Sequence, residues 1–265
     1  MPNWYWQDWN GLPYLRCSLL DAWPHGFFTQ RCWPRHPTDL VEVLDSTAAV
    51  YHLKQVHGNR VWHTQDTHSV QEALGLQTPV QAMPLDEGDG LIGEHPQRAI
   101  WVSTADCTPV LIGDAKTGRT AALHAGWRGT ATQIVPTAIA QLQGIGSQLE
   151  HLRIALGPAI AGEVYQVGRN VALAVGRSVV DASLEDAQVL EQLQGGEEPA
   201  LLPDPHPDRL RLDVQRINLL QLYQLGIRPD QVSVAPYCTY QNPEYFFSYR
   251  RTQEKKVQWS GIVSS

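Results

Sequence analysis

Several features that would indicate particular classes of protein are scarce in this chain. Its 20 Lys and Arg are outnumbered by 27 Asp and Glu, the formal net charge is −7, and no long basic run occurs. Because nucleic-acid binding needs clustered cations, we expect no nucleic-acid partner. A run of about 18 apolar residues is absent, which argues against a membrane partner or a membrane span. The N-terminus has neither the basic start nor the apolar stretch of a signal peptide.

Cysteine is also scarce. The four cysteines are widely spaced and form no C-x-x-C pair: Cys17, Cys32, Cys107 and Cys238. This pattern is typical of a reducing compartment, where a cysteine is more often buried, catalytic or a metal ligand than bridged. We therefore expect a cytoplasmic protein without disulfides.

What is present is the composition of a globular protein. Apolar residues make up 43% of the chain and charged residues 18%, so its 265 residues can bury a large core without a disulfide or a structural metal. We find no internal repeat and no low-complexity tract. Candidate helices and strands are interspersed, hairpins occur, and strict β-α-β alternation does not. The patterns predict a mixed α+β fold in a single domain over residues 1–265.

Hydrophobic periodicity and turn residues predict where the elements lie. Strands are expected at 38–56, 99–106, 109–114, 119–124, 151–160, 232–236 and 244–251. Helices are expected at 130–143, from Gly168 onward, at 184–193 and at 213–226. Loops are expected over most of 64–90, with one short helix, and over 195–210.

Cys107 and His124 are predicted to lie at the same end of one hairpin. Cys107 follows the apolar run AIWVSTAD, and a strand end is where side chains often face a cleft. If 109–114 pairs with 119–124 across the turn AKTG, His124 lies beside Pro109, two residues from Cys107. From the residues alone, this predicted proximity is the argument that Cys107 and His124 share a site.

A histidine and cysteine pair has three uses, which the residues alone leave open. As metal ligands, Cys107 and His124 would be joined by His57 of QVHGNRV, and two imidazoles with one thiolate leave a fourth position open, as in catalytic zinc sites. As a dyad, His124 would deprotonate Cys107 for attack on an acyl group. In the third case both residues are ordinary buried side chains. Asp89 and Asp106 either orient a ligand or form turns.

Four arginines are candidates for binding a phosphate. Arg60 in HGNR and Arg128 in GWRGT flank the candidate site in sequence, and Arg250 and Arg251 follow the aromatic run YFFSY. Each guanidinium can hold a phosphate through two parallel hydrogen bonds. The alternative for each is an ordinary surface ion pair.

Short stretches over nearly the whole chain together resemble one family. They are HGFFTQR, QVHGNRV, GDGLI, TADCTPVLIGD, ALHAGWRGT, LGPAI, YQV, LDVQRINLLQL, and CT followed by FFSYRR. This combination, above all ADC followed by HAGWRG, is similar to the YfiH family, also called the polyphenol oxidoreductase (laccase-domain) or DUF152 family. One departure is the tail after FFSYRR, which reads TQEKKVQWSGIV and leaves the role of the tail open.

The resemblance implies a mixed β-sheet sandwich flanked by helices, in which His57, Cys107 and His124 bind one zinc ion. It implies phosphorolysis of adenosine, inosine, guanosine and methylthioadenosine, together with adenosine deamination. Older descriptions of the family imply copper-dependent oxidation of phenols, and others a relation to bacterial toxin deamidases or editing of peptidoglycan precursors.

Our leading hypothesis is therefore a zinc-dependent purine nucleoside phosphorylase with adenosine deaminase activity, in which Arg60 or Arg128 holds inorganic phosphate. Copper is the alternative metal, because thiolate and imidazole also bind it. One alternative function is a thiol hydrolase or deamidase that uses Cys107 and His124, and another is a structural metal-binding protein. A copper-dependent polyphenol oxidoreductase would need about ten histidines and a cysteine. The chain has ten histidines in all and no His-x-His pair.

Overall fold

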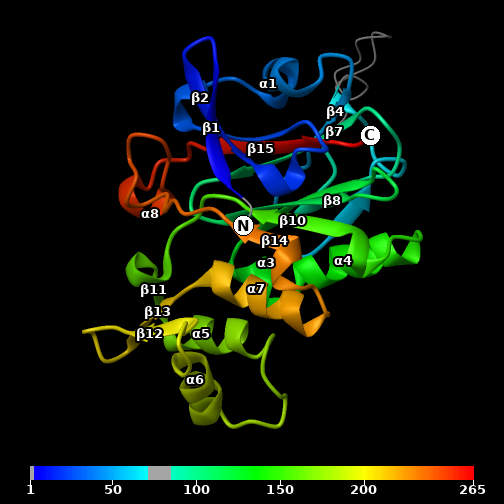
Figure 1. Ribbon diagram of the computed structural model, residues 1–265. Coiled ribbons are helices and arrows are strands. Elements are labelled where there is room, and N and C mark those ends of the chain that lie inside the picture. The colour runs from blue at the N-terminus through cyan, green and yellow to red at the C-terminus, as the bar shows by residue number, and fades with distance from the viewer. Residues whose placement is uncertain (1–2, 71–84) are drawn as a thin grey trace.

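Two β-sheets stacked face to face form the centre of the protein (Figure 1). The computed structural model describes residues 3–70 and 85–265. The first sheet has the order β1 (Trp4–Trp9), β2 (Leu12–Cys17), β3 (His25–Phe28), β15 (Gln258–Val263), β7 (Arg98–Thr104) and β4 (Ala49–Tyr51). The second has the order β14 (Val232–Val234), β10 (Leu152–Leu156), β8 (Thr108–Asp114), β9 (Thr120–Ala125), β6 (Gly90–Gly93) and β5 (Val61–His63).

Both sheets are mixed. The β4–β7, β5–β6 and β10–β14 pairs are parallel, and the other pairs in these two sheets are antiparallel. A smaller antiparallel sheet has the order β11 (Gln166–Gly168), β13 (Arg209–Leu212) and β12 (Leu201–Pro203). Short 3-10 helices connect several elements: Ser18–Leu20, Gln30–Cys32, Leu149–His151, Gly162–Val164 and Pro229–Gln231.

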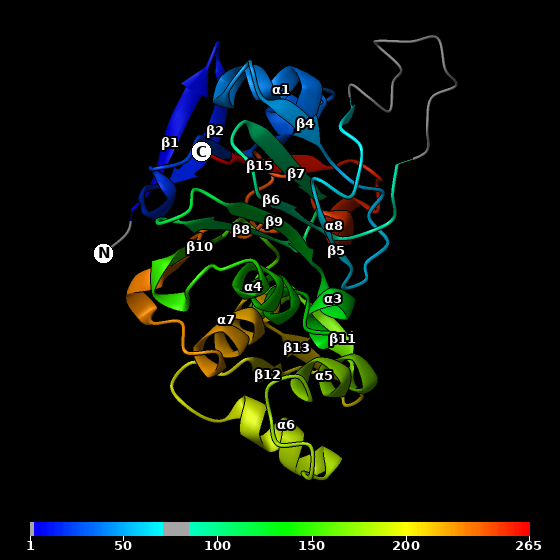
Figure 2. The same cartoon turned by 90° about the vertical axis from the view of Figure 1, so that its right-hand side faces the viewer.

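Helices cover the outer faces of the two sheets (Figure 2). On the outer side of the first sheet lies α1 (Pro37–Leu44). Below the second sheet lie α3 (Trp127–Ala131), α4 (Ile134–Gly144) and α7 (Val214–Gln224). Farther from the sandwich, α5 (Arg169–Gly176) and α6 (Asp186–Gln194) pack with the small sheet, and α8 (Tyr249–Thr252) precedes β15. The predicted sandwich flanked by helices is confirmed.

Strand β8 shows why these residues form layers. All seven of its residues are buried, as expected of a strand that is covered on both faces. Leu111 packs between the two sheets against residues of the first sheet such as Ile100 and Ile262. Its neighbours Val110 and Ile112 point to the other face and pack with residues of α4 and α7. Full burial of each such side chain stabilises the fold by about 1.5–3 kcal/mol.

Several predicted elements are confirmed. The strands expected at 99–106, 109–114, 119–124, 151–160 and 232–236 correspond to β7, β8, β9, β10 and β14. The helices expected from Gly168, at 184–193 and at 213–226 correspond to α5, α6 and α7. No helix within residues 3–70 and 85–265 is long and apolar enough to cross a bilayer.

The strand predicted over 38–56 is wrong for its first half. Pro37 occupies the first turn of α1, where its missing N–H is not needed, and the Asp39 side chain accepts from the His36 N–H as part of a capping box. Leu40 and Val41 are buried on one face of this helix. Only the short β4 follows. In this segment the signals that start a helix therefore outweigh the preference of the β-branched residues for a strand.

The single helix predicted over 130–143 is in fact two. Gln133, with φ 61°, adopts a left-handed conformation between α3 and α4. In one continuous helix the ring of Pro136 would clash with the carbonyl of Thr132. That carbonyl would also lack a hydrogen-bond donor, because proline has no backbone N–H. The break places Pro136 in the first turn of α4, where no such donor is required.

The strand predicted over 244–251 is also wrong. Ser248 caps the short helix α8 by accepting from the Arg251 N–H, and Phe246 is buried. The tail after it forms β15 instead, which lies between β3 and β7. The loop expected over 195–210 contains β12 and the first residues of β13. Of the loop and short helix expected over 64–90, residues 71–84 lie outside the described residues.

Candidate metal centre

The β8–β9 hairpin places Cys107 and His124 at one end of the second sheet. Pro109 pairs with His124 in the register that the turn length predicts, and Thr108 pairs with Ala125. Cys107 directly precedes β8, so it lies beside the end of β9 that carries His124. The predicted proximity of Cys107 and His124 is confirmed.

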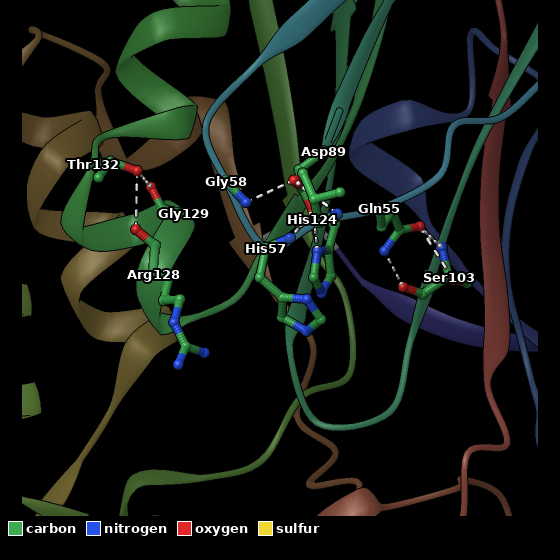
Figure 3. A network of polar contacts seen from close by, with 10 residues as sticks. Gln55, His57, Gly58, Asp89, Ser103, His124, Arg128, Gly129 and Thr132 are labelled. Carbon is green, nitrogen blue, oxygen red and sulfur yellow. Dashed lines mark hydrogen bonds and ion pairs between the residues drawn. The ribbon is translucent and has the colours of Figure 1, made fainter. Parts of the chain in front are cut away.

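His57 reaches this place from the segment between β4 and β5. The residue has φ 60°, a left-handed conformation that few non-glycine residues adopt. The carboxylate of Asp89 holds the segment by accepting backbone N–H bonds from His57 at 2.9 Å and from Gly58 at 2.7 Å (Figure 3). It also accepts from the Val56 N–H at 3.2 Å. These bonds offset the cost of the unusual conformation.

The three side chains form a compact cluster. One ligand atom from each of His57, Cys107 and His124 lies within 4.8 Å of the other two. The two imidazole rings are 4.8 Å apart between centroids and nearly perpendicular, at 85°. His124 is buried, Cys107 is partly buried and His57 is exposed, so the cluster opens to solvent on the side of His57.

Asp89 also orients His124. Nδ1 of His124 donates to Asp89 Oδ1 at 2.8 Å, and the His124 backbone N–H donates to the Asp89 carbonyl at 2.7 Å (Figure 3). With Nδ1 engaged in this way, Nε2 is the nitrogen left for the cluster. A carboxylate that fixes the ring of a metal-ligating histidine is a common partner in metal sites. Of the two aspartates singled out in the sequence, Asp89 orients the candidate ligands.

The charges in the cluster favour a thiolate beside an imidazolium when no metal is bound. Burial alone would raise the pKa of the Cys107 thiol, but the charge and hydrogen bonds of His124 and His57 lower it to about 6. Burial alone would lower the pKa of His124, but the Cys107 charge and the hydrogen bond to Asp89 raise it to about 9. Burial likewise opposes the ionised form of Asp89, yet its hydrogen bonds to His124 and Gly58 lower its pKa.

This donor set suits a transition metal. Zinc and copper both bind imidazole nitrogen and thiolate sulfur, and three protein ligands leave one position open. Gly126 keeps the sulfur accessible, because a Cβ there would lie only 2.9 Å from Cys107 Sγ. Within the part of the chain that the structure describes, no second group of three His, Cys, Asp or Glu side chains is so arranged.

The two arginines predicted to flank the site differ in their surroundings. Arg128 extends from α3 on the same side as the His57 ring, and its guanidinium lies 4.3 Å from the ring centroid of Trp127 (Figure 3). Arg60 lies over the Trp62 ring at 3.9 Å. Both side chains are exposed.

Asp106 and Tyr165 are two further residues in the surroundings of the cluster. The sequence did not single out Tyr165. Asp106, with φ 98°, accepts from Thr239 Oγ1 and from the Arg250 N–H, both at 2.7 Å. Burial, together with the charge of Cys107, raises the pKa of Tyr165 to about 12. The tyrosine precedes β11, far along the chain from Cys107, so no local pattern could place it at the site.

Comparison with known proteins shows which family the chain resembles. A family model described as multi-copper polyphenol oxidoreductase laccase matches residues 36–263. A Synechocystis protein named purine nucleoside phosphorylase slr1573 is 50% identical over 264 residues, covering 98% of this chain and 97% of the relative. A protein of an unknown prokaryotic organism named adenosine deaminase RL5 is 25% identical over 219 residues, covering 80% of this chain and 78% of the relative.

A solved structure has the same fold. The crystal structure of the Bacillus licheniformis hypothetical protein YfiH matches with a TM-score of 0.76 at 22% sequence identity, and the match covers 95% of this chain and 96% of that one. The resemblance to the YfiH family that the sequence motifs indicated is confirmed. The chain therefore belongs to the family described as multi-copper polyphenol oxidoreductase laccase, whose named relatives here include enzymes.

Proposed function

We propose that this protein is a zinc-dependent purine nucleoside phosphorylase that also deaminates adenosine. The observation that carries the proposal is the convergence of His57, Cys107 and His124 within 4.8 Å, open on one side to solvent. The names of the Synechocystis relative and of the adenosine deaminase relative support the two activities. We propose that residues 1–265 act as one catalytic domain in the cytoplasm.

In this proposal the three clustered side chains hold the zinc ion and Asp89 keeps the His124 ring in place. Histidine and cysteine are both zinc ligands, and three protein ligands with an open fourth position are the arrangement of catalytic zinc. When bound, the metal supplies Lewis-acid chemistry at the open position. Copper is the alternative occupant, since the general affinity order favours it over zinc.

The substrates are adenosine, inosine, guanosine or methylthioadenosine, together with inorganic phosphate. Phosphate attacks the sugar carbon that bears the base, the bond from that carbon to the base nitrogen breaks, and the sugar 1-phosphate and free base leave. As in glycoside cleavage, positive charge develops on the sugar in the transition state. Arg128 is placed to hold the phosphate, because its guanidinium extends on the His57 side of the cluster. Arg60 is less well placed, since it is stacked on Trp62.

The test is phosphate-dependent release of adenine from adenosine, separated by chromatography. Zinc-loaded wild type is compared with Cys107→Ala and His124→Ala, each with its metal content measured. We expect adenine and ribose 1-phosphate from wild type and at least a roughly 100-fold lower rate from both variants. Absence of product from folded wild type under every metal loading would refute the proposal.

A thiol hydrolase or deamidase is the second candidate. The observation in its favour is the closeness of the Cys107 thiol to His124, whose charge and hydrogen bond lower the pKa of the thiol, a pairing used by thiol enzymes. The two candidates respond in opposite ways to a chelator. Chelation removes turnover if the metal is required, whereas a thiol enzyme keeps its turnover and loses it on alkylation of Cys107.

Two further alternatives have weaker support. A multi-copper oxidase needs several copper centres, whereas the described residues offer one group of three ligands. A structural metal-binding protein would lose thermal stability on metal removal and would show no turnover in either state.

A further inference from the structure

We propose that Arg250 binds the phosphate of this site in addition to Arg128, and that Asp106 and Tyr165 position Arg250. The inference rests on the proposed phosphorolysis and names a second residue that recognises its anionic substrate. The sequence alone offers Arg60, Arg128, Arg250 and Arg251 without distinguishing them. Their contacts in the folded chain do so.

Asp106 fixes the backbone of Arg250 next to Cys107. Its carboxylate is buried, and its two oxygens accept separate hydrogen bonds, one from Thr239 Oγ1 and one from the Arg250 N–H. Because Asp106 immediately precedes Cys107, the position of Arg250 is tied to the thiol rather than to a distant part of the chain. The positive φ of Asp106, 98°, indicates that the backbone is held in an unusual conformation to make this link.

Two further contacts direct the Arg250 side chain. Nη1 donates to the Gln166 carbonyl at 2.8 Å, and the guanidinium carbon lies 4.8 Å from the centroid of the Tyr165 ring. Among residues 3–70 and 85–265, no carboxylate forms an ion pair with this guanidinium, and its Nε and Nη2 groups donate to no protein atom. That edge is the one that forms two parallel bonds to a phosphate.

Tyr165 lies beside this guanidinium, and the charge of the metal cluster acts on its hydroxyl. Its pKa responds to the charge of Cys107 and, in the opposite direction, to the charges of Arg250 and Arg128. The hydroxyl is therefore within electrostatic range of the thiol and of both guanidinium groups.

The other arginines are engaged elsewhere or are less firmly held. The Arg251 guanidinium donates to the carbonyls of Thr239, Tyr240 and Phe246 at 2.7–2.8 Å, so it holds the loop before α8 together. Arg60 is stacked on Trp62. Within the described part of the chain, the Arg128 guanidinium lies over the ring of its neighbour and makes no hydrogen bond or ion pair, so it lacks the fixed geometry of Arg250.

The experiment measures binding of inorganic phosphate to the full-length, zinc-loaded protein by isothermal titration calorimetry. Arg250→Gln is compared with wild type and with Arg228→Gln, an exposed arginine that pairs with Asp230 beside β14. Arg228 is a matched control because it lies near Leu152, at the end of the second sheet opposite to Cys107. Arg250→Lys keeps the charge without the two parallel bonds.

We expect the phosphate dissociation constant to rise roughly 10- to 100-fold in Arg250→Gln, to rise less in Arg250→Lys, and to stay unchanged in Arg228→Gln. In the phosphorolysis assay the KM for phosphate should rise similarly, with a smaller change in the KM for the nucleoside. Equal phosphate affinity in wild type and Arg250→Gln, or no binding to wild type, would overturn the inference.

The failure of phosphorolysis is distinguishable from the failure of this inference. Phosphate binding that depends on Arg250, without release of any purine base, would support the anion site and refute the proposed reaction. Thermal unfolding of each variant shows whether the fold is kept, and the milder Arg250→Lys supplies the comparison if Arg250→Gln does not fold.

Discussion

At the scale of single residues, Asp89 connects the segments that carry two of the three clustered side chains. One oxygen of its buried carboxylate accepts from His124 Nδ1 and from the His57 N–H, and the other accepts from the Gly58 N–H. Hydrogen bonds to an ionised acceptor are about twice as strong as neutral ones. Asp89 therefore holds both the His57 segment and the His124 ring in place.

Replacing Asp89 by Asn should weaken zinc binding roughly 10- to 100-fold. The amide keeps the shape of the side chain but turns one acceptor into a donor and removes the negative charge that orients His124. Competition with a chromophoric chelator measures the zinc dissociation constant. Asp208→Asn, at an exposed position outside the site, serves as the control. An unchanged affinity in Asp89→Asn would show that the carboxylate does not organise the ligands.

His25 makes the stability of the fold depend on pH. Its Nε2 accepts from the Cys17 N–H and its Nδ1 donates to the Trp23 carbonyl, which requires the neutral ring. Burial lowers the pKa of His25 from 6.5 to about 4.

Below pH 6.5 the unfolded chain takes up a proton at His25 that the folded protein does not accept until about pH 4. This residue should therefore lower the free energy of unfolding by up to about 3 kcal/mol as the pH falls through that window. Urea unfolding at a series of pH values measures the slope. His25→Asn should unfold with a shallower dependence between pH 6.5 and 4, and an identical slope would contradict the assignment.

At the scale of elements, the site depends on the close approach of α3 to the segment that carries His57. A Cβ on Gly129 would lie 2.7 Å from the Gly58 carbonyl oxygen, so only glycine allows this contact. Gly144, the last residue of α4, is not constrained in the same way, because a Cβ there would meet no heavy atom within 4 Å.

Gly129→Ala should destabilise the protein by about 1–3 kcal/mol, because the helix or the His57 segment has to shift. It should also weaken zinc binding, since the shift displaces a ligand. Gly144→Ala is the matched control, and we expect it to be neutral or to stabilise the protein by about 1 kcal/mol or less. Calorimetric melting with and without zinc tests both. Equal effects of the two substitutions would argue against a role for the α3 contact.

Local patterns predicted the part of the site that local structure builds. The turn between β8 and β9 sets the register, so the proximity of Cys107 and His124 could be deduced from spacing. His57 could be placed only by resemblance, and Arg250 could not be placed at all. Each is held at the site by a hydrogen bond to an aspartate that is distant in the chain, His57 by Asp89 and Arg250 by Asp106. The same limit explains β15, whose neighbours β3 and β7 are distant in the chain.

At the scale of the whole molecule, a bound metal would join two connections and one strand of the sandwich. His57 lies between β4 and β5, Cys107 between β7 and β8, and His124 near the end of β9. A ligand that binds only the folded state stabilises it by mass action.

Zinc should therefore raise the melting temperature in a concentration-dependent way. At free zinc roughly 100-fold above the dissociation constant, the gain in unfolding free energy is about 2.7 kcal/mol. Differential scanning calorimetry over a zinc series measures it, and His57→Ala should show a reduced gain because one ligand is lost. A melting temperature that does not respond to zinc in wild type would contradict a folded-state metal site.

Strand β15 also determines when the structure can be completed during protein synthesis. Residues 258–263 leave the ribosome long after β3 and β7, which until then have no common neighbour and each present an unpaired edge to other chains. The Arg250 segment that attaches to Asp106 emerges only shortly before β15. A nascent chain can thus form the β8–β9 hairpin early, with Cys107 and His124 adjacent, but it acquires Arg250 only as the first sheet closes.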